Sequence, residues 1–243
     1  MVRPAVQLPS RQDADRPLSD LVERAAAAGF EGVEFAPFAE DVDAAAVREA
    51  LSRIGLPAVG AHVSIDRLGE DTEATLAFYR GLGCERFVVP GIPPERFETE
   101  RAVETAAQRL DGLAVALGEY GVSVHYHGRG YEFTDLGDRT AYEYLVELTE
   151  HVGFDPDAAS ALATGVDPAG LVEQLDGRAP LLHATDYDRG AGERVPIGQG
   201  DLDVSALVDA HTAAGGEWIV HPFDDPMPPD SLADAVLATG GAP

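Results

Sequence analysis

Short apolar runs alternate with amphipathic segments along nearly the whole 243-residue chain. The runs are typical of β-strands, and most intervals between them carry apolar residues at helical spacing. The predicted strands begin near Ala5, Gly32, Ala58, Arg86, Val122, Val152, Pro180 and Glu217. Eight such strand–helix units predict an α/β fold, a single (β/α)8 barrel formed by residues 1–243.

The sequence predicts some elements of this pattern more clearly than others. One predicted helix places its apolar residues on a single face over 18–25, and Asp203 and Asp230 are predicted helix N-caps. The sixth strand is the weakest, because Pro156 interrupts it. The longest predicted loop, 189–200, is a candidate lid over the mouth of the barrel.

Histidines cluster where the predicted strands end. Five of the seven lie at or just past these ends: His62, His125, His127, His183 and His221. In a (β/α)8 barrel the carboxyl ends of the strands meet at one mouth, so these side chains are expected to converge. Period-two alternation places His125 and His127 on the same face of their strand. The other two, His151 and His211, fall on predicted helices and are expected at the surface.

Carboxylates follow the same pattern. Glu34 and Glu132 interrupt apolar segments, and burying such an acid is costly unless a cation or a hydrogen-bond donor meets it. We favour a functional role for both over a structural ion pair. Asp186 is equally compatible with a ligand contact and with capping the next turn. Converging imidazoles and carboxylates suit a divalent metal, to which Asp157 is a natural addition.

The charge balance excludes several function classes. The formal net charge is −26 with an isoelectric point near 4.3, and all seventeen basic residues are arginine. The absence of lysine rules out Schiff-base catalysis, a pyridoxal phosphate anchor and a P-loop. The shortage of basic residues disfavours nucleic acid as a partner. Because the acids are interleaved with periodic apolar residues, we interpret the charge as adaptation to high salt rather than as disorder.

Membrane and disulfide signals are weak. No apolar stretch is long enough to span a bilayer and no secretory leader is visible, so we expect a cytoplasmic protein without a membrane partner. The single cysteine, Cys84, excludes an intrachain disulfide and is expected to be buried. A homo-oligomer is left open.

Several motifs in order resemble the sugar phosphate isomerase/epimerase family, the xylose-isomerase-like TIM barrels. The family also includes hydroxypyruvate isomerases, ketose epimerases and inosose dehydratases. The run Tyr-His-Gly-Arg-Gly-Tyr-Glu-Phe at 126–133 is similar to Tyr-His-Asn-His-Gly-Tyr-Glu-Phe in one branch. The other segments that carry the resemblance are 27–35, 60–63, 78–83, 165–168, 182–186, 198–203 and 216–220.

The resemblance implies one divalent metal, held by an acid, an Asp, a His and a final Glu, and it implies Asp157 and His183 as two of these ligands. The chain departs from the family pattern at the last ligand, where His221 replaces the Glu. It departs again at Gly128 and Arg129, which replace an Asn and a His, and at Thr185, which replaces a Lys.

We therefore predict a metal-assisted isomerase or epimerase that acts on a small keto sugar or polyol by proton abstraction next to a carbonyl. The predicted metal ligands are His127, Asp157, His183 and His221. The predicted catalytic groups are Glu132 and His221, and the predicted substrate-binding residues are Glu34, His62, His125, Arg129 and Asp186. The alternatives are a keto-sugar dehydratase or lyase, and a sugar-binding barrel that has lost its chemistry.

Overall fold

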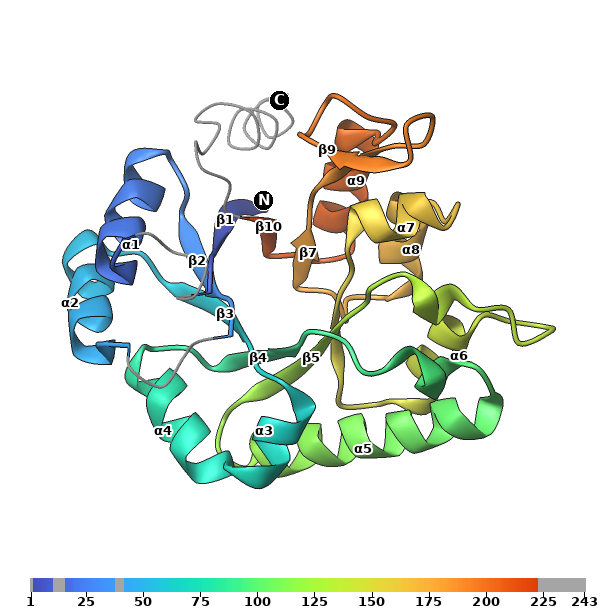
Figure 1. Ribbon diagram of the computed structural model, residues 1–243, viewed down its shortest axis with the longest axis horizontal. Helices are drawn as coiled ribbons and strands as arrows, with labels where there is room; N and C mark the ends of the chain where they lie inside the picture. The colour runs from blue at the N-terminus through green and yellow to red at the C-terminus, as the bar shows by residue number, and fades with distance from the viewer. Residues whose placement is uncertain (1, 11–15, 38–41, 223–243) are drawn as a thin grey trace.

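Eight parallel strands form a TIM barrel surrounded by helices (Figure 1). This computed structural model describes residues 2–10, 16–37 and 42–222. Around the barrel the strands follow the order β6-β5-β4-β3-β2-β1-β10-β7. Their bounds are β1 Arg3–Leu8, β2 Gly32–Phe35, β3 Ala58–His62, β4 Arg86–Val89, β5 Ser123–His127, β6 Gly153–Asp155, β7 Leu181–His183 and β10 Trp218–Pro222. All eight predicted strands are present, so the predicted fold class is confirmed.

Strands β6 and β7 close the barrel through a few contacts rather than a full ladder. The backbone N–H of Phe154 donates to the carbonyl of Arg178 at 2.7 Å, and that of His183 donates to the carbonyl of Pro156 at 2.9 Å. Because Pro156 has no N–H and follows directly after β6, pairing beyond this strand is limited to a single parallel bridge between Asp157 and His183. The predicted weakness of the sixth strand is confirmed.

Helices cover the outside of the barrel (Figure 1). They are α1 Leu18–Ala27, α2 Ala44–Ile54, α3 Ile65–Glu70, α4 Thr72–Gly81, α5 Glu100–Gly118, α6 Ala141–Leu148, α7 Ala158–Ala163, α8 Pro168–Gln174 and α9 Val204–Ala213, with short 3-10 turns η2 Pro94–Phe97 and η3 Tyr131–Phe133. Asp203 caps α9 by accepting from the backbone N–H of Ala206 at 3.0 Å, as predicted. Asp230 lies outside the described residues. Across the described residues, no helix is long and apolar enough to cross a membrane.

The predicted loop 189–200 is partly ordered as a hairpin. Strand β8, Asp186–Asp188, pairs antiparallel with β9, Glu193–Val195, between β7 and α9. The Asp186 carboxylate lies at the base of this hairpin and accepts hydrogen bonds from four backbone N–H groups. This carboxylate therefore connects the start of β8 to the segment that follows β9.

Two histidines expected at the surface differ in their environment. His151 is exposed, as predicted, but lies just beyond the end of α6. His211 is fully buried, which corrects the prediction. Its imidazole contacts the carbonyl oxygen of Trp218 at 3.1 Å, and it lies against Gly216, where a Cβ would clash with the ring. A partner on the following strand, invisible to helical periodicity, holds this side chain inside.

Alternation along the strands divides the side chains between two compartments. Side chains such as Val33 and Phe87 belong to the large core, whereas an apolar layer inside the barrel contains Ala5, Val59, Val88, Leu181, Trp218 and Val220. The interior positions beyond that layer, toward the carboxyl ends of the strands, are polar. This arrangement places the candidate chemistry at the mouth of the barrel.

Candidate metal centre

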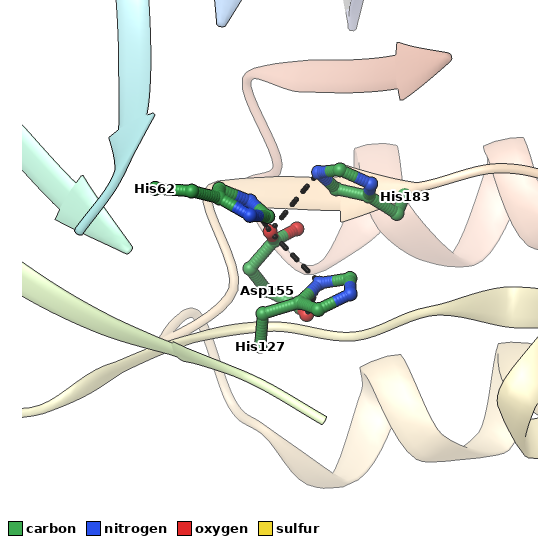
Figure 2. Close-up of side chains that lie close together, drawn as sticks. All are labelled: His62, His127, Asp155 and His183. Atoms are coloured by element: carbon green, nitrogen blue, oxygen red, sulfur yellow. Dashed lines mark hydrogen bonds and ion pairs between the residues drawn. The ribbon is translucent and has the colours of Figure 1, made fainter. Parts of the chain in front are cut away.

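Four strands end in residues that converge on one point. His62, His127, Asp155 and His183 are the last residues of β3, β5, β6 and β7. Each offers one ligand atom, and these atoms all lie within 4.8 Å of one another. Figure 2 shows the three imidazoles arranged around the Asp155 carboxylate. We call these four residues together with Glu34 the mouth cluster.

Asp155 is central to the mouth cluster. Its side chain is fully buried, and its Oδ2 lies 3.2 Å from His183 Nε2, 3.2 Å from His127 Nδ1 and 3.9 Å from His62 Nε2. The register explains this position, because β5 and β6 pair His125 with Gly153 and His127 with Asp155. Asp155 therefore shares the inward face of its strand with a glycine.

Glu34 joins the mouth cluster from the opposite side of the barrel, on β2. Its Oε2 lies 2.8 Å from His183 Nε2 and 3.2 Å from His62 Nε2, and it accepts a hydrogen bond from Gln7 Nε2 at 2.9 Å. The side chain is fully buried. One carboxylate oxygen thus faces nitrogen atoms from three different strands.

Electrostatic attraction inside the mouth cluster outweighs the effect of burial. Burial by itself raises the pKa of the Glu34 carboxyl, but His62 and His183 together lower that pKa to about 2. Burial likewise raises the pKa of Asp155, yet His183 and His127 bring it well below its ordinary value. For His62 and His183, burial lowers the pKa, and the neighbouring carboxylates Glu34 and Asp155 more than reverse this, so both pKa values are raised. The carboxylates and the imidazoles of the cluster therefore stabilise each other's charged forms.

The mouth cluster fits a bound divalent cation. Two carboxylate oxygens, Glu34 Oε1 and Asp155 Oδ1, are buried without a hydrogen-bond partner among the residues described. The Nε2 atom of His183 faces both carboxylates but carries at most one proton, so hydrogen bonding cannot satisfy the pair. Neutral imidazoles and carboxylates at such spacing are ligands for zinc, manganese, iron or cobalt. The donor set thus matches a metal site.

Four of the predicted site residues come together here. His127 and His183 were predicted as metal ligands, and Glu34 and His62 as substrate-binding residues. The structure brings all four into the mouth cluster.

Asp157, predicted as a ligand, lies at the edge of the mouth cluster. Its Oδ2 is 3.9 Å from His127 Nε2. The carboxylate forms two hydrogen bonds with Arg194 of the hairpin, at 3.0 and 3.1 Å, and accepts from the backbone N–H of Ser160 at 2.6 Å as the N-cap of α7. Its side chain is already engaged in joining the hairpin to α7.

Glu132, predicted as the acid/base, lies outside the mouth cluster. It is fully buried, and its carboxylate accepts from Tyr126 Oη at 2.5 Å and from the backbone N–H groups of Arg129 and Gly130. Tyr126 belongs to the core between barrel and helices rather than to the barrel interior. This carboxylate fixes the turn that follows β5.

His221, predicted as both ligand and catalytic group, also lies outside the mouth cluster. Val220 is the residue of β10 paired with His183, and it belongs to the apolar interior layer. Alternation turns the next residue to the opposite face. His221 is buried there, and its Nδ1 donates to the carbonyl of Ala184 at 3.2 Å.

Three predicted substrate-binding residues have other neighbours. Asp186 accepts hydrogen bonds from four backbone N–H groups, one within β8 and three in the segment that follows β9. Arg129 is exposed and its Nε donates to the carbonyl of Pro90 at 2.8 Å. His125 is buried against Gly153, two residues before His127 on the same inward face, and its pKa is lowered to about 3 mainly by burial.

Sequence reasoning missed Asp155 and Gln7. The segment Gly153-Phe154-Asp155-Pro156-Asp157 offers two aspartates, and alternation alone allows both. Only their contacts separate them, since Asp157 pairs with Arg194 and caps α7 whereas Asp155 faces three imidazoles. Gln7 carried no comparable signal, since a lone glutamine on a first strand is compatible with many environments.

Comparisons with known proteins identify the family. The family model described as xylose isomerase-like TIM barrel matches residues 22–237. A solved sugar phosphate isomerase/epimerase from Parabacteroides distasonis is similar with a TM-score of 0.78 and 16% identity, covering 99% of each chain. An L-ribulose 3-epimerase is similar with a TM-score of 0.64 and 16% identity, covering 93% of this chain and 83% of its own.

A third solved structure broadens this range of activities. A probable 3-DHS dehydratase, AsbF, from Bacillus anthracis is similar with a TM-score of 0.70 and 11% identity, covering 98% of this chain and 97% of its own. No protein with curated annotation matches the sequence significantly. At these identities the solved structures establish only the shared fold. The match of the family model over most of the sequence establishes the family as well. The chain belongs to the xylose isomerase-like TIM barrel family.

Proposed function

We propose that this protein is a metal-dependent enzyme that isomerises or epimerises a small keto sugar or polyol. The observation that supports this proposal is the convergence of His62, His127, Asp155 and His183 at the mouth of a barrel of this family. A divalent metal bound there would act as a Lewis acid and polarise a carbonyl oxygen.

His127 is the group to which we assign proton transfer. Its Nδ1 lies 3.1 Å from the carbonyl oxygen of Asp155, which accepts but cannot donate, so Nδ1 carries the proton and Nε2 the lone pair. A histidine whose tautomer is fixed by a hydrogen bond at Nδ1 presents the lone pair of Nε2 as a base. Glu132 and His221 lie outside the mouth cluster, so this proposal does not use them as bases.

The direct test combines metal analysis with isotope exchange. Protein purified without chelator is expected to bind about one divalent metal per chain. Incubation with a panel of keto sugars in D₂O is expected to place deuterium on the carbon next to the carbonyl, because the abstracted proton exchanges with solvent. His127→Gln is expected to keep the metal and lose the exchange, whereas the exposed control His151→Gln is expected to keep both.

The outcomes separate the rival functions. Deuterated isomer or epimer supports the proposal, and loss of water from the substrate would replace it with a dehydratase. Ligand binding without exchange across the panel would favour a sugar-binding barrel. A protein that takes up no manganese, zinc or cobalt would overturn the metal-dependent reaction.

A further inference from the structure

We infer that Glu34, and not His127, supplies the fourth protein ligand of this metal, beside His62, Asp155 and His183. The inference rests on the proposed metal site and goes beyond it by fixing the ligand set. It places one carboxylate from β2 and one from β6 on opposite sides of two imidazoles.

The two carboxylates and two imidazoles lie at distances close to those around one metal ion. From Glu34 Oε2, the distances are 2.8 Å to His183 Nε2 and 3.2 Å to His62 Nε2. From Asp155 Oδ2, they are 3.2 Å to His183 Nε2 and 3.9 Å to His62 Nε2. Ligands bound to one zinc at about 2.1 Å lie roughly 3 to 3.5 Å from each other. The four carboxylate–imidazole distances are therefore close to the spacing of ligands around one ion.

The ring of His127 directs its protonated nitrogen toward Asp155. Its Nδ1 faces the backbone carbonyl of Asp155 at 3.1 Å and the carboxylate Oδ2 of the same residue at 3.2 Å. Nδ1 therefore carries the proton, and the lone pair on Nε2 faces Asp157 Oδ2 at 3.9 Å, at the edge of the mouth cluster. The geometry makes His127 a partner that orients the Asp155 carboxylate, an arrangement typical of residues behind metal ligands.

The residues around Glu34 leave room for its carboxylate and fix its orientation. A Cβ at Gly60 would lie 2.9 Å from Glu34 Oε1 and 3.3 Å from Leu181 Cδ1, so glycine at this position leaves room for the carboxylate. Gln7 Nε2 also donates to Glu34 Oε2 at 2.9 Å and fixes its orientation. On the other side of His183, the inward position of β10 is occupied by the apolar Val220. A ligand that cannot come from β10 is thus available from β2.

This ligand set predicts the class of metal. Two imidazoles and two carboxylates neutralise a divalent ion and favour zinc, iron, cobalt or manganese. Magnesium prefers oxygen ligands and retains several waters, so it is disfavoured here.

X-ray absorption spectroscopy of the zinc-loaded full chain tests the inference by counting imidazoles. We expect two imidazoles in the wild type, and the same two in His127→Gln. Glu34→Gln is expected to keep both imidazoles, to lose one oxygen neighbour, and to weaken zinc binding by about a hundredfold or more, measured by competition with a chelator. The tenfold-to-hundredfold loss typical of outer partners is the range expected for His127→Gln.

A variant that leaves every ionisable group in place provides a control for charge. Gly60→Ala is expected to displace the Glu34 carboxylate and to weaken zinc binding in the same direction as Glu34→Gln. Circular dichroism verifies that each variant is folded.

Three imidazoles in the wild type that fall to two in His127→Gln would overturn the inference while leaving the metal-dependent function intact. An unchanged zinc affinity in Glu34→Gln would overturn it as well. Failure of the wild type to bind any metal would remove both this inference and the proposed function.

Discussion

Glu34 and Asp155 inside the barrel are as fully buried as Glu132 and Asp186 outside it, yet the two pairs have different partners. Glu132 and Asp186 accept hydrogen bonds mainly from backbone N–H groups, whose positions are fixed by the turns they hold. Glu34 and Asp155 face imidazoles, and each retains one buried oxygen with no hydrogen-bond partner in the described part of the chain.

The comparison shows that burial alone does not distinguish a site from a structural carboxylate. A backbone N–H satisfies a carboxylate permanently, and therefore favours a single folded structure. Imidazoles can exchange a proton for a metal, so a carboxylate among them remains available for chemistry. Whether its donors are backbone N–H groups or imidazoles therefore distinguishes a structural carboxylate from one in a candidate site.

The largest expected effect comes from removing an inner carboxylate. Asp155→Asn is expected to reduce affinity for zinc or manganese by at least about a hundredfold, because a ligand beside three imidazoles loses its charge. Asp157→Asn is the matched control, since that carboxylate pairs with Arg194 and should leave metal binding nearly unchanged. Isothermal titration calorimetry measures both. A greater loss in the Asp157 variant would reverse our assignment of the two aspartates.

Removing Asp186, a carboxylate outside the barrel interior, should lower stability rather than metal affinity. Asp186→Ala is expected to lower the free energy of unfolding by about 3 kcal/mol, because four backbone N–H groups lose a charged acceptor. Urea denaturation measures the loss, with the exposed Glu119→Gln as control. Metal content per folded chain should not change. Loss of metal at full stability would place Asp186 with the inner carboxylates.

The pH dependence of stability offers a smaller test on His211. Burial lowers the pKa of this imidazole to about 4, whereas the unfolded chain titrates near its ordinary value of 6.5. Between these values the unfolded state binds more protons, so stability is fully present above pH 6.5 and falls as the pH drops toward 4. From pH 7 to pH 5 the contribution of His211 is about 2 kcal/mol.

Urea denaturation of His211→Gln and wild type at several pH values isolates the contribution of His211 to the pH dependence of stability. The variant should lose less stability than the wild type between pH 7 and pH 5. His151→Gln, which removes an exposed imidazole, provides the comparison. Parallel curves for His211→Gln and wild type would show that burial of His211 does not control its titration.

Salt should have the smallest effect, and it should distinguish surface from interior. At a net charge of −26, repulsion between surface groups is screened at about 1 M salt, where the Debye length is about 3 Å. We expect the unfolding temperature to rise by several degrees, with the buried mouth cluster changing its zinc affinity much less. Sucrose at equal osmolality is the control. A salt response no greater than the sucrose response would argue against adaptation to high salt.

Much of the fold was predictable because its signals are local. Strand starts near Gly32, Ala58 and Arg86 match the structure, since apolar runs between helical segments are read directly from the sequence. Strand-end histidines were informative for the same reason: His62, His127 and His183 reach the mouth because parallel strands end there.

One corrected prediction, and one choice between two aspartates that the sequence left open, both concern the direction in which a single side chain points. His211 had the spacing of a surface helix residue, but the carbonyl of Trp218 on a different element holds it inside. Asp157 and Asp155 satisfy the same alternation, and only their contacts separate them. Such choices depend on the register of neighbouring strands, which no local pattern records.

The sequence by itself determined the barrel, its family resemblance and the end of the barrel at which the chemistry is expected, because periodicity and composition are properties of short segments. Only the tertiary structure decided which polar residues meet. Register placed Asp155 beside His127 and Val220 beside His183, and barrel closure carried Glu34 from β2 to within 2.8 Å of His183 on β7. Contacts between residues so far apart in the chain depend on strand pairing around the whole ring.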